Sequence, residues 1–79
     1  MGVDDAPNQP VLMSRHAESR MAERGIREEQ VRAAIYGPDE SWIGSEGEVN
    51  VRKRFTHDVL RVCYISLPDG SRVITVIVE

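Results

Sequence analysis

The spacing of apolar residues changes about halfway along the chain. In the first half, apolar side chains recur at intervals of three and four residues, which is the period of a helix with one buried face. From Ser41 onward they alternate with polar side chains, which is the period of a strand with one buried face. The pattern therefore predicts two short helices followed by a set of strands.

The first helix is expected over about Arg15 to Arg24. Ser14 is a suitable N-cap, because its hydroxyl can accept a hydrogen bond from a backbone N–H of the first turn. Gly25 suits the left-handed conformation that ends many helices. Ala17 and Met21 form a narrow apolar stripe, and the stripe beside it carries three residues spaced four apart: His16, Arg20 and Arg24.

The second helix is expected over about Arg27 to Tyr36. Glu28 and Glu29 fall in its first turn, where the helix dipole favours acidic side chains. Gly37 and Pro38 are typical of a helix end. Its buried face is expected to consist of Val31, Ala34 and Ile35.

Three main strands follow from the alternating pattern. Val49 to Phe55 alternates, although Lys53 interrupts its apolar face, and Val59 to Leu67 alternates after it. Val73 to Val78 is apolar at almost every position, as expected for a central strand covered on both faces. The segment from Pro68 to Ser71 predicts the turn before that last strand. Two shorter segments are candidate additional strands: Val11–Met13 and Ser41–Ile43.

The predicted fold class is therefore α+β. We expect the two N-terminal helices to pack on one face of an antiparallel sheet of three or four strands, with the opposite face left open. Residues 1–10 contain prolines and acidic residues and are expected to form a flexible N-terminal arm. Residues 11–79 are expected to form one domain, with the Val73–Val78 strand inside the sheet.

The composition indicates the cell compartment in which the protein is expected. No apolar run approaches the roughly 20 residues that a membrane-spanning helix needs, so no membrane partner is expected. No basic and apolar leader is visible at the N-terminus. The single cysteine, Cys63, forms no disulfide framework and is expected to be a small buried apolar residue. Together these features predict a cytoplasmic protein.

The charge of the chain is unevenly distributed. The formal net charge of −3 argues against binding of nucleic acid through bulk charge alone. Residues 50–61, however, carry four basic residues against one acidic residue, Asp58. Two interpretations remain open for this stretch: a focused anion-binding site, or an ordinary strand whose charged residues are solvated. The basic residues concerned are Arg52, Lys53, Arg54 and Arg61.

The residues available for chemistry favour one reaction class. The sequence has no phosphate-binding loop, dinucleotide fingerprint, nucleophile elbow or metal-ligand spacing, so no cofactor is expected. Histidine, arginine, lysine and tyrosine side chains remain. Metal-free cleavage of RNA needs a base for the ribose 2′-OH, cations for the transition-state charge and an acid for the leaving oxygen, which these side chains can supply.

Three segments of the sequence carry a family resemblance. The first reads Ser14-Arg15-His16-Ala17-x-x-Arg20-Met21-x-x-Arg24-Gly25-Ile26, followed by Val31 and Pro38-Asp39, and the others are Arg61-Val62-Cys63-Tyr64 and Val73-Ile74-Thr75-Val76. They resemble the bacterial domain-of-unknown-function family 4258 over roughly residues 11–79. That family is similar to RelE/ParE-type toxins, a resemblance that implies a small sheet packed on two helices. The toxins include ribonucleases, both ribosome-dependent and free, and proteins that poison other targets.

The resemblance also implies roles for individual residues. The polar signature of the family falls on His16, Arg20, Arg24, Arg61, Tyr64 and Thr75. We interpret four residues as catalytic: His16, Arg20, Arg61 and Tyr64. Four more are interpreted as binding the substrate: Arg24, Lys53, Arg54 and Thr75. His16 and Arg20 are expected to lie near Arg61, and near Lys53 or Tyr64, around one shared groove.

Two functions follow from these roles. The first is a metal-independent ribonuclease or toxin-type effector of RelE/ParE-like fold, with RNA as its partner. The alternative is a non-catalytic domain of the same fold that binds a small antitoxin-like protein or a second copy of itself, or that retains no activity. The stripe of His16, Arg20 and Arg24 favours the first function. The net charge of −3 argues against ribosome-dependent cleavage, because toxins that act on the ribosome are usually strongly basic. Trp42, the only tryptophan, is available for base stacking or for an interface.

Overall fold

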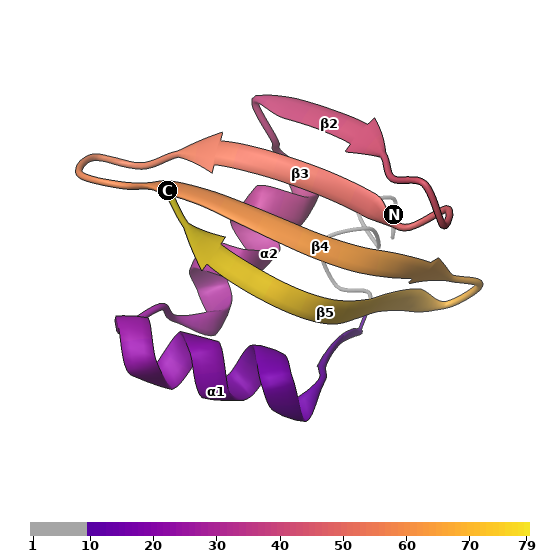
Figure 1. Cartoon of the computed structure of the whole chain (residues 1–79), viewed down its shortest axis with the longest axis horizontal. Helices are drawn as coiled ribbons and strands as arrows, with labels where there is room; N and C mark the ends of the chain where they lie inside the picture. Colours follow the sequence, from indigo (N-terminus) through magenta and orange to yellow (C-terminus); the bar gives the residue numbers. More distant parts are fainter. Residues whose placement is uncertain (1–9) are drawn as a thin grey trace, which may run out of the picture.

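The computed structural model describes residues 10–79 and places two helices against one five-stranded sheet. The predicted flexible arm therefore lies outside the described residues except for Pro10. Strand order across the sheet is β1-β5-β4-β3-β2, and Figure 1 shows α2 behind the middle of the sheet and α1 alongside β5. The elements are β1 (Val11–Met13), α1 (Arg15–Arg24), α2 (Glu28–Tyr36), β2 (Glu40–Ile43), β3 (Val49–Arg54), β4 (Val59–Leu67) and β5 (Gly70–Val78).

Both helices begin and end close to the predicted residues. Ser14 caps α1, because its Oγ accepts the N–H of Ala17 at 3.0 Å, and Gly25 ends the helix in the left-handed region at φ 68°. The Ser14 hydroxyl also donates to the carbonyl oxygen of Ile74 at 2.9 Å. One side chain therefore begins α1 and also fastens it to β5. The second helix begins at Glu28 rather than at Arg27, which is its N-cap residue.

The sheet differs from the prediction in two respects. It has five strands instead of three or four, because both short candidate segments pair. It is also mixed rather than wholly antiparallel, since β1 runs parallel to β5. Ser71 donates its N–H to the Pro10 carbonyl at 3.0 Å. Gly70 permits this approach, since a Cβ at that position would overlap the Pro10 oxygen.

The last strand is internal over only part of its length. It lies between β4 and β1, as predicted, but β1 pairs only with Ser71, Arg72 and Val73. Beyond that point α1 packs beside β5 (Figure 1). The predicted internal position of Val73–Val78 is therefore confirmed at Val73, and the remainder of the strand is bordered by a helix.

The core lies between the helices and one face of the sheet and consists mainly of small side chains. Five valines are almost fully buried: Val31, Val51, Val62, Val73 and Val76. Val73 and Val76 both point to the helices although they are three apart, which regular alternation would forbid. A β-bulge resolves this, because Tyr64 pairs with Val73 and Cys63 pairs with Thr75, which leaves Ile74 as the extra residue.

Candidate functional site

The sheet face away from the helices, here called the open face, gathers most of the charged strand residues. In β3 and β4 the residues that alternate with buried Val51, Leu60 and Val62 point to this side. Their partners on β2 and β5 follow from the register. The open face therefore carries Glu40, Trp42, Asn50, Arg52, Arg54, Arg61, Cys63, Ile65, Arg72, Thr75 and Ile77, with Leu12 on β1.

Arg52 is the centre of an ion-pair network on the open face. Its Nε lies 2.9 Å from Oε1 of Glu79, and its Nη1 contacts the carboxylate of Glu40. Its guanidinium lies 5.2 Å from the ring centroid of Trp42. Hydrogen bonds from Glu40 and then Glu79 raise the pKa of Arg52 above its usual value, so this group stays charged at every physiological pH.

Arg61 shares the second carboxylate oxygen of this network. It lies opposite Arg52 in the sheet, and its Nη1 is 3.8 Å from Oε2 of Glu79. Glu79 therefore bridges two adjacent arginines that would otherwise repel each other. The Nε of Arg61 is buried and has no hydrogen-bond partner within residues 10–79.

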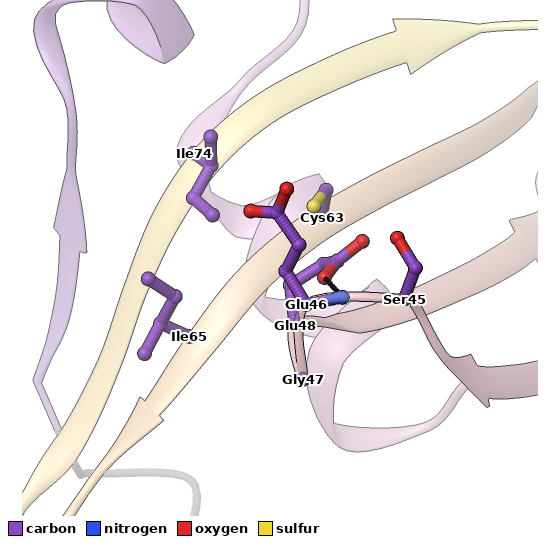
Figure 2. A pocket seen from close by; sticks show the side chains of 7 residues that line it. All are labelled: Ser45, Glu46, Gly47, Glu48, Cys63, Ile65 and Ile74. Atoms are coloured by element: carbon purple, nitrogen blue, oxygen red, sulfur yellow. Dashed lines mark hydrogen bonds between the residues drawn. The ribbon is translucent and has the colours of Figure 1, made fainter.

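A hollow of about 440 Å³ lies on the open face beside the β2–β3 loop. Figure 2 shows its lining, with Cys63 and Ile65 on β4, Ile74 on β5, and loop residues facing them. The β-bulge brings Ile74 into this lining, because it turns two consecutive β5 residues toward the open face. The loop contributes Ser45, Glu46, Gly47 and Glu48.

The two acidic residues of the hollow have different surroundings. Oε1 of Glu48 accepts the backbone N–H of Glu46 at 3.0 Å (Figure 2). The same carboxylate lies against Gly44, where any Cβ would overlap it. Burial, and then the charge of Glu48, raise the pKa of the Cys63 thiol, so this cysteine is neutral and weakly nucleophilic at pH 7. The Glu46 carboxylate makes no hydrogen bond or ion pair within the described part of the chain.

The residues predicted on the first helix form an exposed stripe. His16, Arg20 and Arg24 are all exposed on α1. Arg20 lies 3.6 Å from Glu23 in an exposed ion pair of the i, i+3 type. Arg20 and Arg24 also line a small hollow of about 260 Å³ against Val76–Val78. His16 makes no hydrogen bond or ion pair among residues 10–79.

Two predicted strand residues point to the helix side of the sheet. Lys53 donates from Nζ to the carbonyl oxygen of Gly37 at 2.8 Å, which fastens the end of α2 to β3. Tyr64 packs against the core, and burial, followed by the proximity of Tyr36, raises the pKa of its hydroxyl. Three others lie on the open face: Arg54, Arg61 and Thr75.

The prediction of one shared groove is wrong for Arg61. Leu60 and Val62 on either side of it point into the core, so Arg61 points away from the helices, and the sheet separates it from His16 and Arg20. The catalytic and substrate-binding roles of these residues stay predictions. Within residues 10–79 no group of three or more His, Cys, Asp or Glu side chains could hold a metal ion.

The sequence analysis did not identify the acidic residues on and around the open face. Glu40 and Glu79 hold Arg52, and Glu46 and Glu48 border the hollow, yet none of them was a predicted site residue. Alternation along β2 was a usable signal for Glu40, since it shares a face with Trp42. The contact of Glu79 with Arg52 joins residues 27 apart, and only the strand register reveals it.

Comparison with known proteins gives one match. The family model described as "Domain of unknown function (DUF4258)" matches residues 13–78. No curated protein and no solved structure matches the chain. The matched segment contains the whole lining of the hollow and most of the open face, whereas Leu12 and Glu79 lie just outside it. Neither described helix is long and apolar enough to cross a bilayer.

Proposed function

The chain belongs to the DUF4258 family, and from that premise we propose that it is a non-catalytic domain that binds another protein through the open face. The resemblance of the sequence to this family is confirmed by the match over residues 13–78. Its description assigns no activity, so the proposal rests on the geometry of the site. It is the second of the two functions expected from the sequence.

One observation carries the proposal: the open face combines a cluster of paired charges with exposed apolar side chains. Arg52 and Arg61 are paired with carboxylates of the same chain. Three large apolar side chains on this face keep 38% to 55% of their surface exposed: Leu12, Trp42 and Ile65. A protein partner that covers them removes apolar surface from water, and tryptophan is a residue type that often dominates binding energy.

The partner that suits this face is a protein segment carrying apolar and basic side chains. Glu40 on the edge strand β2 and Glu79 after β5 are already paired with Arg52 and Arg61, whereas Glu46 and Glu48 border the hollow and have no cationic partner among residues 10–79. The carboxylates of Glu46 and Glu48 repel phosphate groups and attract lysine or arginine. A small antitoxin-like protein in the cytoplasm would satisfy this requirement.

The experiment that tests the proposal is a two-hybrid screen in a bacterial host, repeated with two double variants. The open-face variant is Trp42→Ala with Ile65→Ser, and the matched control on α1 is His16→Ala with Arg20→Ala. Both pairs are exposed, so circular dichroism should show an unchanged fold. Partners should be lost with the open-face variant and retained with the control. Loss with the α1 variant instead, or no partner that depends on Trp42, would contradict the proposal.

A ribonuclease of RelE/ParE-like fold is the second candidate function. The observation that favours it is that Arg54, Arg61 and Thr75, all predicted to contact RNA or its transition state, share the open face. RNA laid across this face would find Trp42 available for stacking. This candidate requires cleavage that persists in EDTA, leaves a 2′,3′-cyclic phosphate and falls by on the order of 10²-fold in Arg61→Ala. RNA that remains intact at high protein concentration rules it out.

A further inference from the structure

We propose that the hollow beside the β2–β3 loop receives a lysine or arginine side chain of the protein partner. This inference rests on the proposed function, because it states which chemistry the partner presents to one part of the open face. The partner would thus be recognised by a basic residue flanked by apolar ones.

The hollow has an apolar floor and an acidic border. Ile65 and Ile74 lie on neighbouring strands, and Cys63 lies between them and the loop (Figure 2). Glu46 and Glu48 stand on the loop beside this floor. None of the seven lining residues is basic.

A long basic side chain matches both parts of this arrangement. The aliphatic stem of lysine or arginine packs on apolar surface while its charged head stays at a polar border. A neutral apolar side chain would cover the same floor but would leave the carboxylates without a counter-charge. An acidic side chain or a phosphate would be repelled by them. Charge complementarity therefore favours a cationic side chain in the hollow.

The two carboxylates are available in different ways. Glu46 has no hydrogen-bond or ion-pair partner within residues 10–79, so its carboxylate is free to meet an incoming cation. Glu48 is held by the Glu46 N–H and lies against Gly44, which fixes its charge beside the floor. Because Glu48 is already held, its side chain loses little conformational entropy when the ligand arrives. Burial raises the pKa of Cys63, so the thiol adds no negative charge of its own.

The test is a titration of the ¹⁵N-labelled full chain with three blocked tripeptides, followed by NMR. The probe is acetyl-Leu-Lys-Leu-amide, and the matched control replaces lysine by norleucine, which keeps the stem and lacks the ammonium group. The third peptide carries glutamate at that position. We expect the lysine peptide to shift the amide signals of residues 44–48, Cys63, Ile65 and Ile74 at millimolar concentration, and to bind more tightly than the other two.

Two single variants locate the charge. Glu46→Gln should weaken binding of the lysine peptide by about 2- to 5-fold, the usual range for one exposed ion pair. The same variant should leave the affinity for the norleucine peptide unchanged. Glu18→Gln removes an exposed carboxylate of α1 and should leave the affinity of the chain for both peptides unchanged. Equal shifts by the lysine and norleucine peptides, shifts elsewhere on the chain, or no shift at all would overturn the inference.

The outcome separates this inference from the proposed function. The proposed function fails if the Trp42 and Ile65 double variant retains the partner found by two-hybrid screening. The inference fails by itself if that variant loses the partner but the parent chain binds the lysine peptide no more tightly than the norleucine peptide, or if Glu46→Gln leaves the affinity for the lysine peptide unchanged. The peptide titration therefore decides the inference, and the partner screen decides the proposed function.

Discussion

Replacing Ser14, the N-cap of α1, by alanine should destabilise the fold more than replacing Ser19 within that helix. Its hydroxyl accepts from Ala17 N–H at 3.0 Å and donates to the Ile74 carbonyl at 2.9 Å. Loss of a serine N-cap costs about 1 kcal/mol. The lost bond to Ile74 adds about 0.5–1.5 kcal/mol. The expected decrease in the free energy of unfolding is therefore about 1.5–2.5 kcal/mol.

Urea denaturation followed by circular dichroism measures this change. With a slope of about 1 kcal/mol per molar urea for a small domain, the midpoint should fall by about 1.5–2.5 M. Ser14→Thr keeps both hydrogen bonds and should lie near the parent protein. Ser14→Asp keeps the cap acceptor but lacks the donor, so it should lose the Ile74 bond and also suffer repulsion between its carboxylate and the Ile74 carbonyl oxygen. Ser19→Ala, on an exposed position of the same helix, is the control. If Ser14→Ala unfolds at the same urea concentration as Ser19→Ala, the double role of this hydroxyl is refuted.

Three further predictions concern contacts elsewhere in the fold. Gly70→Ala should lower the free energy of unfolding by about 1–3 kcal/mol, because its Cβ would overlap the Pro10 oxygen. Gly37→Ala is the control, because its Cβ would meet only ordinary contacts, and it should leave the free energy of unfolding nearly unchanged. Cys63 should react with a disulfide reagent at pH 8 more slowly in the folded protein than in denaturant, because its raised pKa lowers the thiolate fraction; equal rates would contradict this. Lys53→Met should lower the free energy of unfolding by about 0.5–1.5 kcal/mol through loss of the hydrogen bond to the Gly37 carbonyl, as measured by urea denaturation. An unchanged midpoint would show that this hydrogen bond does not stabilise the fold.

The helices could be predicted because their signals are local. Ser14 and Gly25 each act within one turn of α1, so short-range sequence rules suffice to place the ends of that helix. The parallel pairing of β1 could not be predicted in the same way. It joins Val11 to Ser71 across the whole chain, and a three-residue strand leaves no alternation long enough to indicate a partner.

The site was predicted less well than the fold. Alternation in β4 already placed Arg61 on the opposite side from Leu60 and Val62, and those two form the core with the helices. The grouping of Arg61 with His16 and Arg20 rested on their shared helix stripe and on Arg61 being a charge on a strand that otherwise looks buried, and it was at odds with that alternation. The hollow was beyond sequence reasoning, because its floor depends on a bulge at Ile74, and neither glycine nor proline marks that position.

The pairing of β1 with β5 has a consequence for the order in which the chain folds. Strands β2 to β5 form hairpin contacts between neighbouring segments, whereas Ser14 meets Ile74 across 60 residues. Contacts between distant residues carry a larger loop-closure entropy and tend to form late. We therefore expect the antiparallel strands and α2 to assemble first, with β1 and α1 docking last. On a ribosome, α1 is made early but has no binding surface until β5 has emerged. Substitutions at Ser14 should accordingly accelerate unfolding and leave the folding rate nearly unchanged.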